Sequence, residues 1–230
     1  MHMKKLFYIL LVAGLLFGIT SCEGDESAAD RPQIETPDNG GEDDGDENGN
    51  TNPENPNPAG GDILVVYYSF TNNTHAIVSD LLTQIEADVV RVEPAEKGLD
   101  YAANNYALGS ALIAAIRENP NDASSYPAID PVDVEFENYA TVIVAAPLWW
   151  SNMAAPLQTF LFDHGSEMAG KNIGLIVSSA SSGISGVEAD ARRLIPDGNF
   201  LTPSLWIRSS QTSNCHSMTA EWLENTGLIE

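Results

Sequence analysis

A run of small polar residues, SFTNNT at 69–74, stands between an apolar segment and a helix-like one. It holds neither a charge nor a glycine, and apart from Phe70 it offers nothing to a hydrophobic core. The first N–H groups of a helix have no intrahelical acceptor, and the helix dipole favours an anion beside them. Side-chain hydroxyls and amides could complete a shell around a phosphate, and in this run they belong to Ser69, Thr71, Asn72, Asn73 and Thr74. We therefore predict a phosphate-binding loop.

The phosphate expected here is a single phosphomonoester. A nucleoside-triphosphate loop would need the pattern GxxxxGK[ST], whose lysine contacts the β- and γ-phosphates. No lysine or arginine lies between Asp62 and Arg91, and neutral donors suit one monophosphate better than a magnesium-bound triphosphate. The alternative is a helix N-cap at Asn73 or Thr74, which would explain one polar residue and not five.

A second segment, APLWWSNMAAP at 146–156, carries two adjacent tryptophans just after an apolar run. At the edge of a sheet, Trp149 or Trp150 could present its indole to a flat aromatic ligand. The alternative places one tryptophan in the core and the other over a helix.

A third segment, SSASSGISG at 178–186, consists almost entirely of small residues. Gly183 and Gly186 would let the backbone approach the edge of a ring closely. Alone, a loop of serine and glycine gives little information, so its position in the fold decides its meaning.

Apolar runs typical of buried strands alternate with helical stripes along residues 62–230. The expected strands are 63–68, 88–93, 140–147, 171–179 and 200–207. The expected helices are 74–86, 102–118, 154–165, 184–195 and 219–227. We predict an α/β fold with a doubly wound, five-stranded parallel sheet in the order 2-1-3-4-5, in which ligands bind beyond the carboxyl ends of the strands. The three unusual segments follow the first, third and fourth strands and should meet at that edge.

Together the three segments resemble the flavodoxin family. YYSFTNNTHAIVSDL resembles its phosphate loop, commonly S-x-T-G-N-T after a strand. VIVAAPLWWSNMAAPLQTFL resembles its stretch with G-x-P-[IL]-W-W, and GKNIGLIVSSASSGISG resembles its G-K-x-[hydrophobic]…T-S-G-G-S-G segment. The resemblance covers nearly all of residues 62–230 and points in particular to single-domain, flavodoxin-like lipoproteins and reductases.

The resemblance implies FMN as the cofactor. The first segment would hold the FMN phosphate, residues 147–152 would border the isoalloxazine with one tryptophan stacking on it, and residues 179–183 would line its pyrimidine side. The cofactor-binding residues implied in this way are Ser69, Phe70, Thr71, Asn72, Asn73, Thr74, Pro147, Leu148, Trp149, Trp150, Ser151, Asn152, Ser179, Ala180, Ser181, Ser182 and Gly183.

Two positions depart from the family pattern. Asn72 stands where glycine is usual, although asparagine adopts positive φ more readily than most residues. Ala180 and Ser181 replace glycines and would stiffen the third loop. Either change could weaken FMN binding without abolishing it.

The flavin would carry the redox chemistry, so no catalytic side chain is expected. A reductase would pass two electrons from NAD(P)H or another donor to a quinone-like acceptor. A one-electron carrier would instead dock a redox protein partner through its acidic surface, but Ser151 and Asn152 follow the tryptophans where a flexible glycine would suit that role. A third alternative is a surface lipoprotein that keeps the fold and has lost the flavin.

The sequence argues against several other classes of protein. Residues 62–230 carry 21 acidic and seven basic side chains, a net charge of −14, which argues against nucleic acid. A serine hydrolase would need a G-x-S-x-G elbow that the sequence lacks. We expect no metal site, because His75, His164 and His216 lie far apart without ligand spacing.

Further residues are expected to be structural. His75 is interpreted as an exposed helical residue, and Tyr101 and Tyr106 as packing residues rather than substrate contacts. Arg192 and Arg193 are expected on a solvated helix face.

The first 22 residues predict a lipoprotein signal peptide. Lys4 and Lys5 precede an apolar run of 14 residues at 6–19, which is too short to span a bilayer comfortably. ITSC at 19–22 resembles a bacterial lipobox, which implies cleavage before Cys22 and lipidation of its sulfur. Two acyl chains would then anchor an exported protein on the periplasmic or cell-surface side of a bacterial membrane. The alternative is ordinary secretion with a free thiol.

Residues 23–61 are expected to be a disordered acidic tether. They contain 12 acidic residues and one arginine, with almost no aliphatic side chains. Such a segment cannot bury enough apolar surface to offset the entropy of ordering. The predicted organisation is therefore a signal peptide at 1–22, a tether at 23–61 and one domain at 62–230.

Overall fold

The computed structural model describes residues 62–229. The predicted signal peptide, the lipidated Cys22 and the tether lie outside these residues. The strands are β1 Ile63–Tyr67, β2 Asp88–Arg91, β3 Thr141–Trp149, β4 Asn152–Met153, β5 Asn172–Ser179, β6 Asn199–Phe200 and β7 Leu205–Arg208. The α-helices are α1 Asn73–Leu81, α2 Ala103–Glu118, α3 Ala155–His164, α4 Ser185–Leu194 and α5 Cys215–Thr226.

The parallel strands lie in the order β2-β1-β3-β5, and β6 and β7 both pair with the outer side of β5. This arrangement confirms the predicted doubly wound sheet with the order 2-1-3-4-5. The expected fifth strand is present as two pieces, β6 and β7, because Pro203 between them has no N–H to donate to the ladder. The short β4, which was not predicted, pairs antiparallel with the end of β3.

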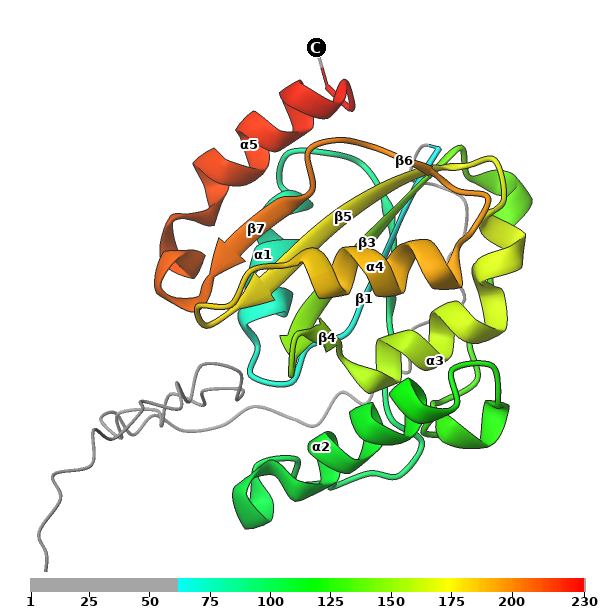
Figure 1. Cartoon of the computed structure of the whole chain (residues 1–230). Helices are drawn as coiled ribbons and strands as arrows, with labels where there is room; N and C mark the ends of the chain where they lie inside the picture. The colour runs from blue at the N-terminus through cyan, green and yellow to red at the C-terminus, as the bar shows by residue number, and fades with distance from the viewer. Residues whose placement is uncertain (1–61, 230) are drawn as a thin grey trace, which may run out of the picture.

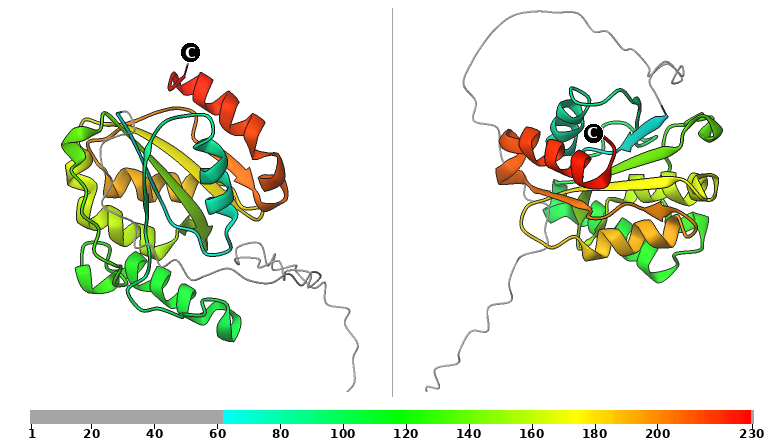
Figure 2. Two further views of the ribbon diagram at one scale, coloured as in Figure 1. Left: turned by 180° about the vertical axis from the view of Figure 1, so that it is seen from behind. Right: turned by 90° about the horizontal axis from the view of Figure 1, so that it is seen from above.

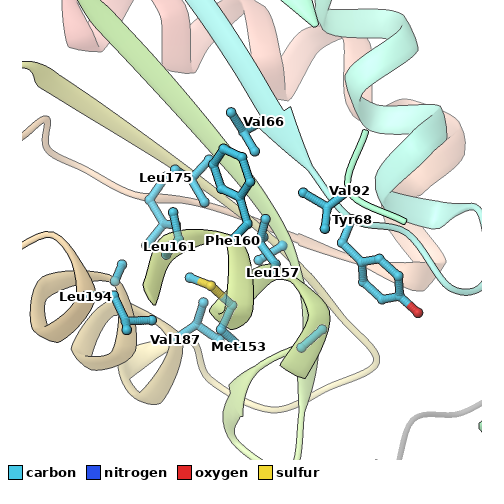
Figure 3. Packing of buried hydrophobic residues seen from close by; sticks show 14 of the residues in the cluster. Val66, Tyr68, Val92, Met153, Leu157, Phe160, Leu161, Leu175, Val187 and Leu194 are labelled. Carbon is cyan, nitrogen blue, oxygen red and sulfur yellow. The ribbon is translucent and has the colours of Figure 1, made fainter. Parts of the chain in front are cut away.

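Helices cover both faces of the sheet (Figures 1 and 2). On one face α1 and α5 pack against alternate strand residues such as Val65, Ile143 and Ile176. On the other face α2, α3 and α4 enclose a larger core that includes Phe160, Leu161 and Val187. Figure 3 shows α3 side chains lying between the strands and α4. The central strands β1, β3 and β5 are buried on both faces, which explains their nearly continuous apolar sequences.

Arg193 corrects one sequence expectation. Its guanidinium donates to Gln158 Oε1 at 2.8 Å and to the Tyr126 hydroxyl at 3.0 Å, and it lies 3.3 Å from Asp190 Oδ1. It therefore ties α4 to α3 and is not part of a solvated face. Arg192 is exposed, with its guanidinium 4.5 Å from the centre of the Phe200 ring.

Within residues 62–229, no helix is long and apolar enough to cross a membrane. The same residues contain no cluster of three or more histidine, cysteine, aspartate or glutamate side chains that could hold a metal ion.

Candidate functional site

The loops after β1, β3 and β5 meet at the carboxyl edge of the sheet, toward which the arrowheads of β5 and β7 point in Figure 1. Between them lies a solvent-open pocket whose empty space is about 380 Å³ when adjoining solvent is included. Its lining residues are Phe70, Thr71, Asn73, Pro147, Leu148, Trp149, Ser178, Ser179, Ala180 and Ser209. All three segments singled out in the sequence therefore contribute to one pocket, which we call the edge pocket.

The residue that joins the first loop to α1 has a left-handed backbone conformation. Asn72 has φ 62° and ψ −1°, directly before the first helical residue Asn73. Asparagine supplies here the conformation for which the flavodoxin pattern uses glycine. Asn73 Nδ2 donates to Thr71 Oγ1 at 3.2 Å, which orders the loop from within.

Two hydroxyls of the predicted phosphate shell have structural partners. The Thr74 hydroxyl is buried and lies 2.7 Å from Ser178 Oγ on β5. Ser69 Oγ accepts a hydrogen bond of 3.2 Å from the backbone N–H of His75. These contacts fix the start of α1 against the sheet, so its first N–H groups lie at the carboxyl edge. Thr71 and Asn73 are the side chains of this loop, with Phe70, that line the edge pocket.

The second loop is a β-hairpin. β3 continues to Trp149, and Leu148 and Trp149 pair with Met153 and Asn152 of β4. The two turn residues, Trp150 and Ser151, have φ values of 46° and 62°. Positive φ at both central residues is the requirement of a type I′ hairpin turn, and it is unusual for a tryptophan.

Both tryptophans of this hairpin have packing partners. Trp149 is only 2% exposed and contacts the rings of Tyr68, Phe70 and Tyr101, with centroids 5.8, 6.2 and 4.9 Å away. Trp150 lies over α2, so close that a Cβ atom at Gly109 would be 2.9 Å from its Cζ3. The structure therefore fits the alternative of one tryptophan in the core and one over a helix. Trp149 also lines the edge pocket, and the stacking of one indole on a ligand stays a prediction.

The hairpin is also held by α4. Asp190 Oδ2 accepts from the Met153 backbone N–H at 2.9 Å and from Asn152 Nδ2 at 3.0 Å. A Cβ atom at Gly186 would lie 1.8 Å from the carbonyl oxygen of Ser151. Gly186 thus allows α4 to pack against the hairpin turn, which differs from the predicted approach to a ring edge.

The third loop is ordered by Ser179. Its hydroxyl accepts from Trp206 Nε1 at 2.8 Å and donates to the Ser182 carbonyl at 3.0 Å. A Cβ atom at Gly183 would meet no atom within 4 Å. Ser179 and Ala180 line the edge pocket, whereas the residues at 181–183 do not.

The predicted cofactor residues thus separate into two groups. Those that line the edge pocket are Phe70, Thr71, Asn73, Pro147, Leu148, Trp149, Ser179 and Ala180. Those outside its lining are Ser69, Asn72, Thr74, Trp150, Ser151, Asn152, Ser181, Ser182 and Gly183. Ser178 and Ser209 also line it and were missed. Ser209 directly follows β7, so the rule that ligands bind beyond the carboxyl ends could have identified it.

The edge pocket is electrically neutral, because its lining includes no charged side chain. His75 stands beside the first loop, exposed on α1, with Nδ1 2.7 Å from the Tyr67 hydroxyl. Burial raises the pKa of Tyr67, so this hydroxyl stays protonated at neutral pH. Polar neutral donors at a helix N-terminus can bind an anion such as a phosphate.

A doubly wound parallel sheet with a pocket beyond the carboxyl ends of its strands is the arrangement in which open α/β proteins bind their ligands. The sequence pattern of the flavodoxin family matches residues 62–226. The chain therefore belongs to the flavodoxin family.

Solved structures share the fold. A protein from Bacteroides eggerthii, solved as a candidate flavoprotein, is 22% identical with a TM-score of 0.57, over 73% of this chain and 98% of that one. A flavoprotein from Lactobacillus acidophilus, solved in complex with FMN, is 18% identical with a TM-score of 0.53, over 69% of this chain and 99% of that one. Comparison with curated proteins gave no match.

Proposed function

We propose that the domain binds FMN in the edge pocket and uses it for oxidoreduction. The observation that carries this proposal is that three loops distant in sequence line one neutral pocket at the N-terminus of α1. Two comparisons also support FMN as the cofactor: the chain belongs to the flavodoxin family, and a flavoprotein with a similar structure was solved in complex with FMN.

The residues present fit FMN. Thr71, Asn73 and the first N–H groups of α1 would hold the phosphate, since they offer neutral donors at a positive helix end. Pro147 and Leu148 would border the ring on one side, and Ser179 and Ala180 on the other. Bound FMN would supply hydride or electron transfer, while these residues would bind and orient it.

The clamped hairpin favours two-electron chemistry. Asp190 holds β4 through two hydrogen bonds, and the Ser151 carbonyl packs against Gly186. Trp150 packs against Gly109 of α2. A backbone rotation beside the flavin would have to break these contacts, so this loop is poorly suited to adjust between single-electron steps. We therefore infer a reductase that passes electron pairs from NAD(P)H or another donor to a quinone-like acceptor.

Absorption spectra test this proposal. The purified full-length protein, loaded with FMN under anaerobic conditions, should lose its 450 nm band on addition of NADH or NADPH and regain it on addition of a quinone. A redox titration should then show one two-electron step. Two well-separated one-electron steps, with no bleaching by either nicotinamide, would contradict the reductase.

An electron carrier is the second candidate. Its support is the net charge of −14 on residues 62–230, which could dock a basic redox protein. The redox titration separates the two candidates, because a carrier needs the two separated steps. A lipoprotein that has lost the flavin would bind no FMN at all.

The domain would act outside the cytoplasm, anchored through Cys22. This part of the proposal rests on the lipobox-like sequence at 19–22 and the acidic residues at 23–61. Labelled palmitate should enter the expressed protein, and Cys22→Ser should abolish that incorporation. Incorporation that persists in the variant would contradict the anchor.

A further inference from the structure

A ring of hydrogen bonds holds β4, the short strand that completes the hairpin beside the edge pocket. Asp190 Oδ2 accepts from the Met153 N–H at 2.9 Å, and Gln158 Nε2 donates to the Met153 carbonyl at 2.7 Å. Arg193 Nη2 closes the ring, because it donates to Gln158 Oε1 at 2.8 Å and lies 3.3 Å from Asp190 Oδ1. Both backbone polar groups of Met153 are therefore fixed by side chains of α3 and α4, which lie beside β4 in Figure 1. We call Gln158, Asp190 and Arg193 the backbone clamp.

The backbone clamp is largely buried, and its members satisfy one another. Gln158 is 1% exposed and Asp190 is 8% exposed. Burial of a charge and an amide costs free energy that their hydrogen bonds return, so a complete network of this kind adds little net stability but favours a single arrangement. The charges of Asp190 and Arg193 cancel, which leaves the neighbouring edge pocket neutral.

The backbone clamp is connected to the edge pocket through the main chain. The Ala154 N–H donates to the Pro147 carbonyl at 3.1 Å, and Leu148 pairs with Met153 across the hairpin. Pro147 and Leu148 both line the edge pocket. This wall of the pocket therefore pairs directly with the strand that the backbone clamp holds.

The turn of the same hairpin is strained. Trp150 and Ser151 have φ values of 46° and 62°, in the left-handed region that is unfavourable for residues other than glycine. An unrestrained hairpin could relieve this strain by rotating its peptide groups. Strained backbone persists where the surrounding structure fixes it, and it is concentrated at functional sites. The backbone clamp supplies that restraint beside the edge pocket.

We propose that the backbone clamp positions the pocket wall so that bound FMN takes up its two electrons in one step, an inference that rests on the proposed function. None of its three side chains lines the edge pocket, so they are positioning residues that act through the backbone of Met153. A wall free to rotate after the first electron would favour two separate one-electron steps. In both cases each FMN takes up two electrons in total, and an external donor supplies them.

A redox titration of the FMN-loaded full-length protein, with dithionite as the reductant, tests the backbone clamp. Arg193→Gln opens the ring and should split the single two-electron step of the wild type into two resolved one-electron steps. Arg192→Gln is the matched control, because it removes the same charge from the exposed neighbouring position on α4, and it should keep the single step. Asp190→Asn is nearly isosteric and should produce the same split as Arg193→Gln, so the test does not depend on the folding of one variant.

Two further measurements separate positioning from stability. Tyr126→Phe removes a hydroxyl that accepts from Arg193 at 3.0 Å and donates to the Pro120 carbonyl at 2.6 Å, but it leaves the ring closed. This variant should lower the melting temperature and keep the single step. In the protein without FMN, Asp190→Asn should speed up exchange of the Met153 amide proton about 3- to 10-fold relative to the Val144 amide of β3, because a charge-assisted hydrogen bond is weakened. Nuclear magnetic resonance follows both amides.

The outcomes distinguish this inference from the proposed function. A single step in Arg193→Gln and Asp190→Asn, or a split in Tyr126→Phe or Arg192→Gln, would overturn the role of the backbone clamp and leave FMN binding untouched. Equal acceleration of the Met153 and Val144 amides would overturn it as well, since the variant would then act through global stability. Absence of FMN binding, or two separated steps in the wild type, would contradict the proposed function and this inference with it.

Discussion

The first loop and the hairpin lie at the same edge of the sheet, yet they differ in what the fold requires of them. Thr71 and Asn72 are exposed, and the hydrogen bonds of the first loop are short-range or connect it to β5. In the hairpin, Trp149 is buried and the turn is held by α2 and α4. Side chains that the fold does not need are free to bind a ligand, whereas those of the hairpin mainly provide stability. Substitutions in the first loop should therefore change ligand affinity, and substitutions in the hairpin should change the stability of the fold.

The largest expected effect is at Trp149. Trp149→Ala removes a 2% exposed indole from contacts with three other rings and should lower the free energy of unfolding by about 3–5 kcal/mol. Thr71→Ala, at an exposed position of the first loop, should change it by less than about 0.5 kcal/mol. Urea denaturation measures both. An equal decrease in the free energy of unfolding in the two variants would contradict this difference between the loops.

Gly186→Ala should have the second largest effect and lower the free energy of unfolding by about 3 kcal/mol. Its Cβ atom would lie 1.8 Å from the Ser151 carbonyl oxygen, so α4 or the hairpin must shift. Gly183→Ala, in the loop just before α4, is the matched control, since its Cβ atom meets nothing within 4 Å. Thermal melts without FMN should show a clear decrease for the first variant and little change for the second. Similar melting temperatures would mean that α4 does not clamp the hairpin.

Thr74→Val should lower the free energy of unfolding by about 1–2 kcal/mol, because it leaves the buried Ser178 hydroxyl without its partner 2.7 Å away. Adding Ser178→Ala should recover most of that loss, since the orphaned hydroxyl is then removed as well. A double-mutant cycle, built from denaturation curves, measures the coupling free energy between Thr74 and Ser178. Additive losses would show that the two hydroxyls do not join α1 to β5.

The smallest effect is expected at Asn72. Because its φ is 62°, Asn72→Gly should relieve backbone strain and raise stability by about 0.5 kcal/mol. Asn73→Gly makes the same chemical change one residue later, inside α1, and should lower stability by a similar amount. Opposite shifts in the denaturation midpoint are expected. A destabilised Asn72→Gly variant would contradict the left-handed assignment.

The sequence predicted the sheet order because apolar strands of four to nine residues alternate with helical stripes, and right-handed crossovers leave few topologies. It also placed the three loops at one edge. It did not predict β4, since two residues carry no periodic signal and the turn at Trp150 and Ser151 contains no glycine or asparagine to mark it.

The site was predicted in part for a similar reason. Hydroxyl-rich composition identified Thr71 and Asn73, but it could not distinguish Thr74, whose hydroxyl faces β5, from residues that line the pocket. The role of Gly186 depends on a tertiary contact with Ser151, 35 residues earlier in the chain, which composition alone cannot reveal. Likewise, Trp206 holds Ser179 through a bond between separate strands.

The most direct measurement compares FMN with riboflavin, which lacks the phosphate. Titration of the full-length protein, followed by quenching of flavin fluorescence, should give a dissociation constant for FMN at least about 100-fold lower, as expected for two charge-assisted hydrogen bonds. Thr71→Ala should reduce this preference without loss of stability. Equal affinity for the two flavins, or no quenching by FMN at millimolar concentration, would contradict a phosphate site at the start of α1.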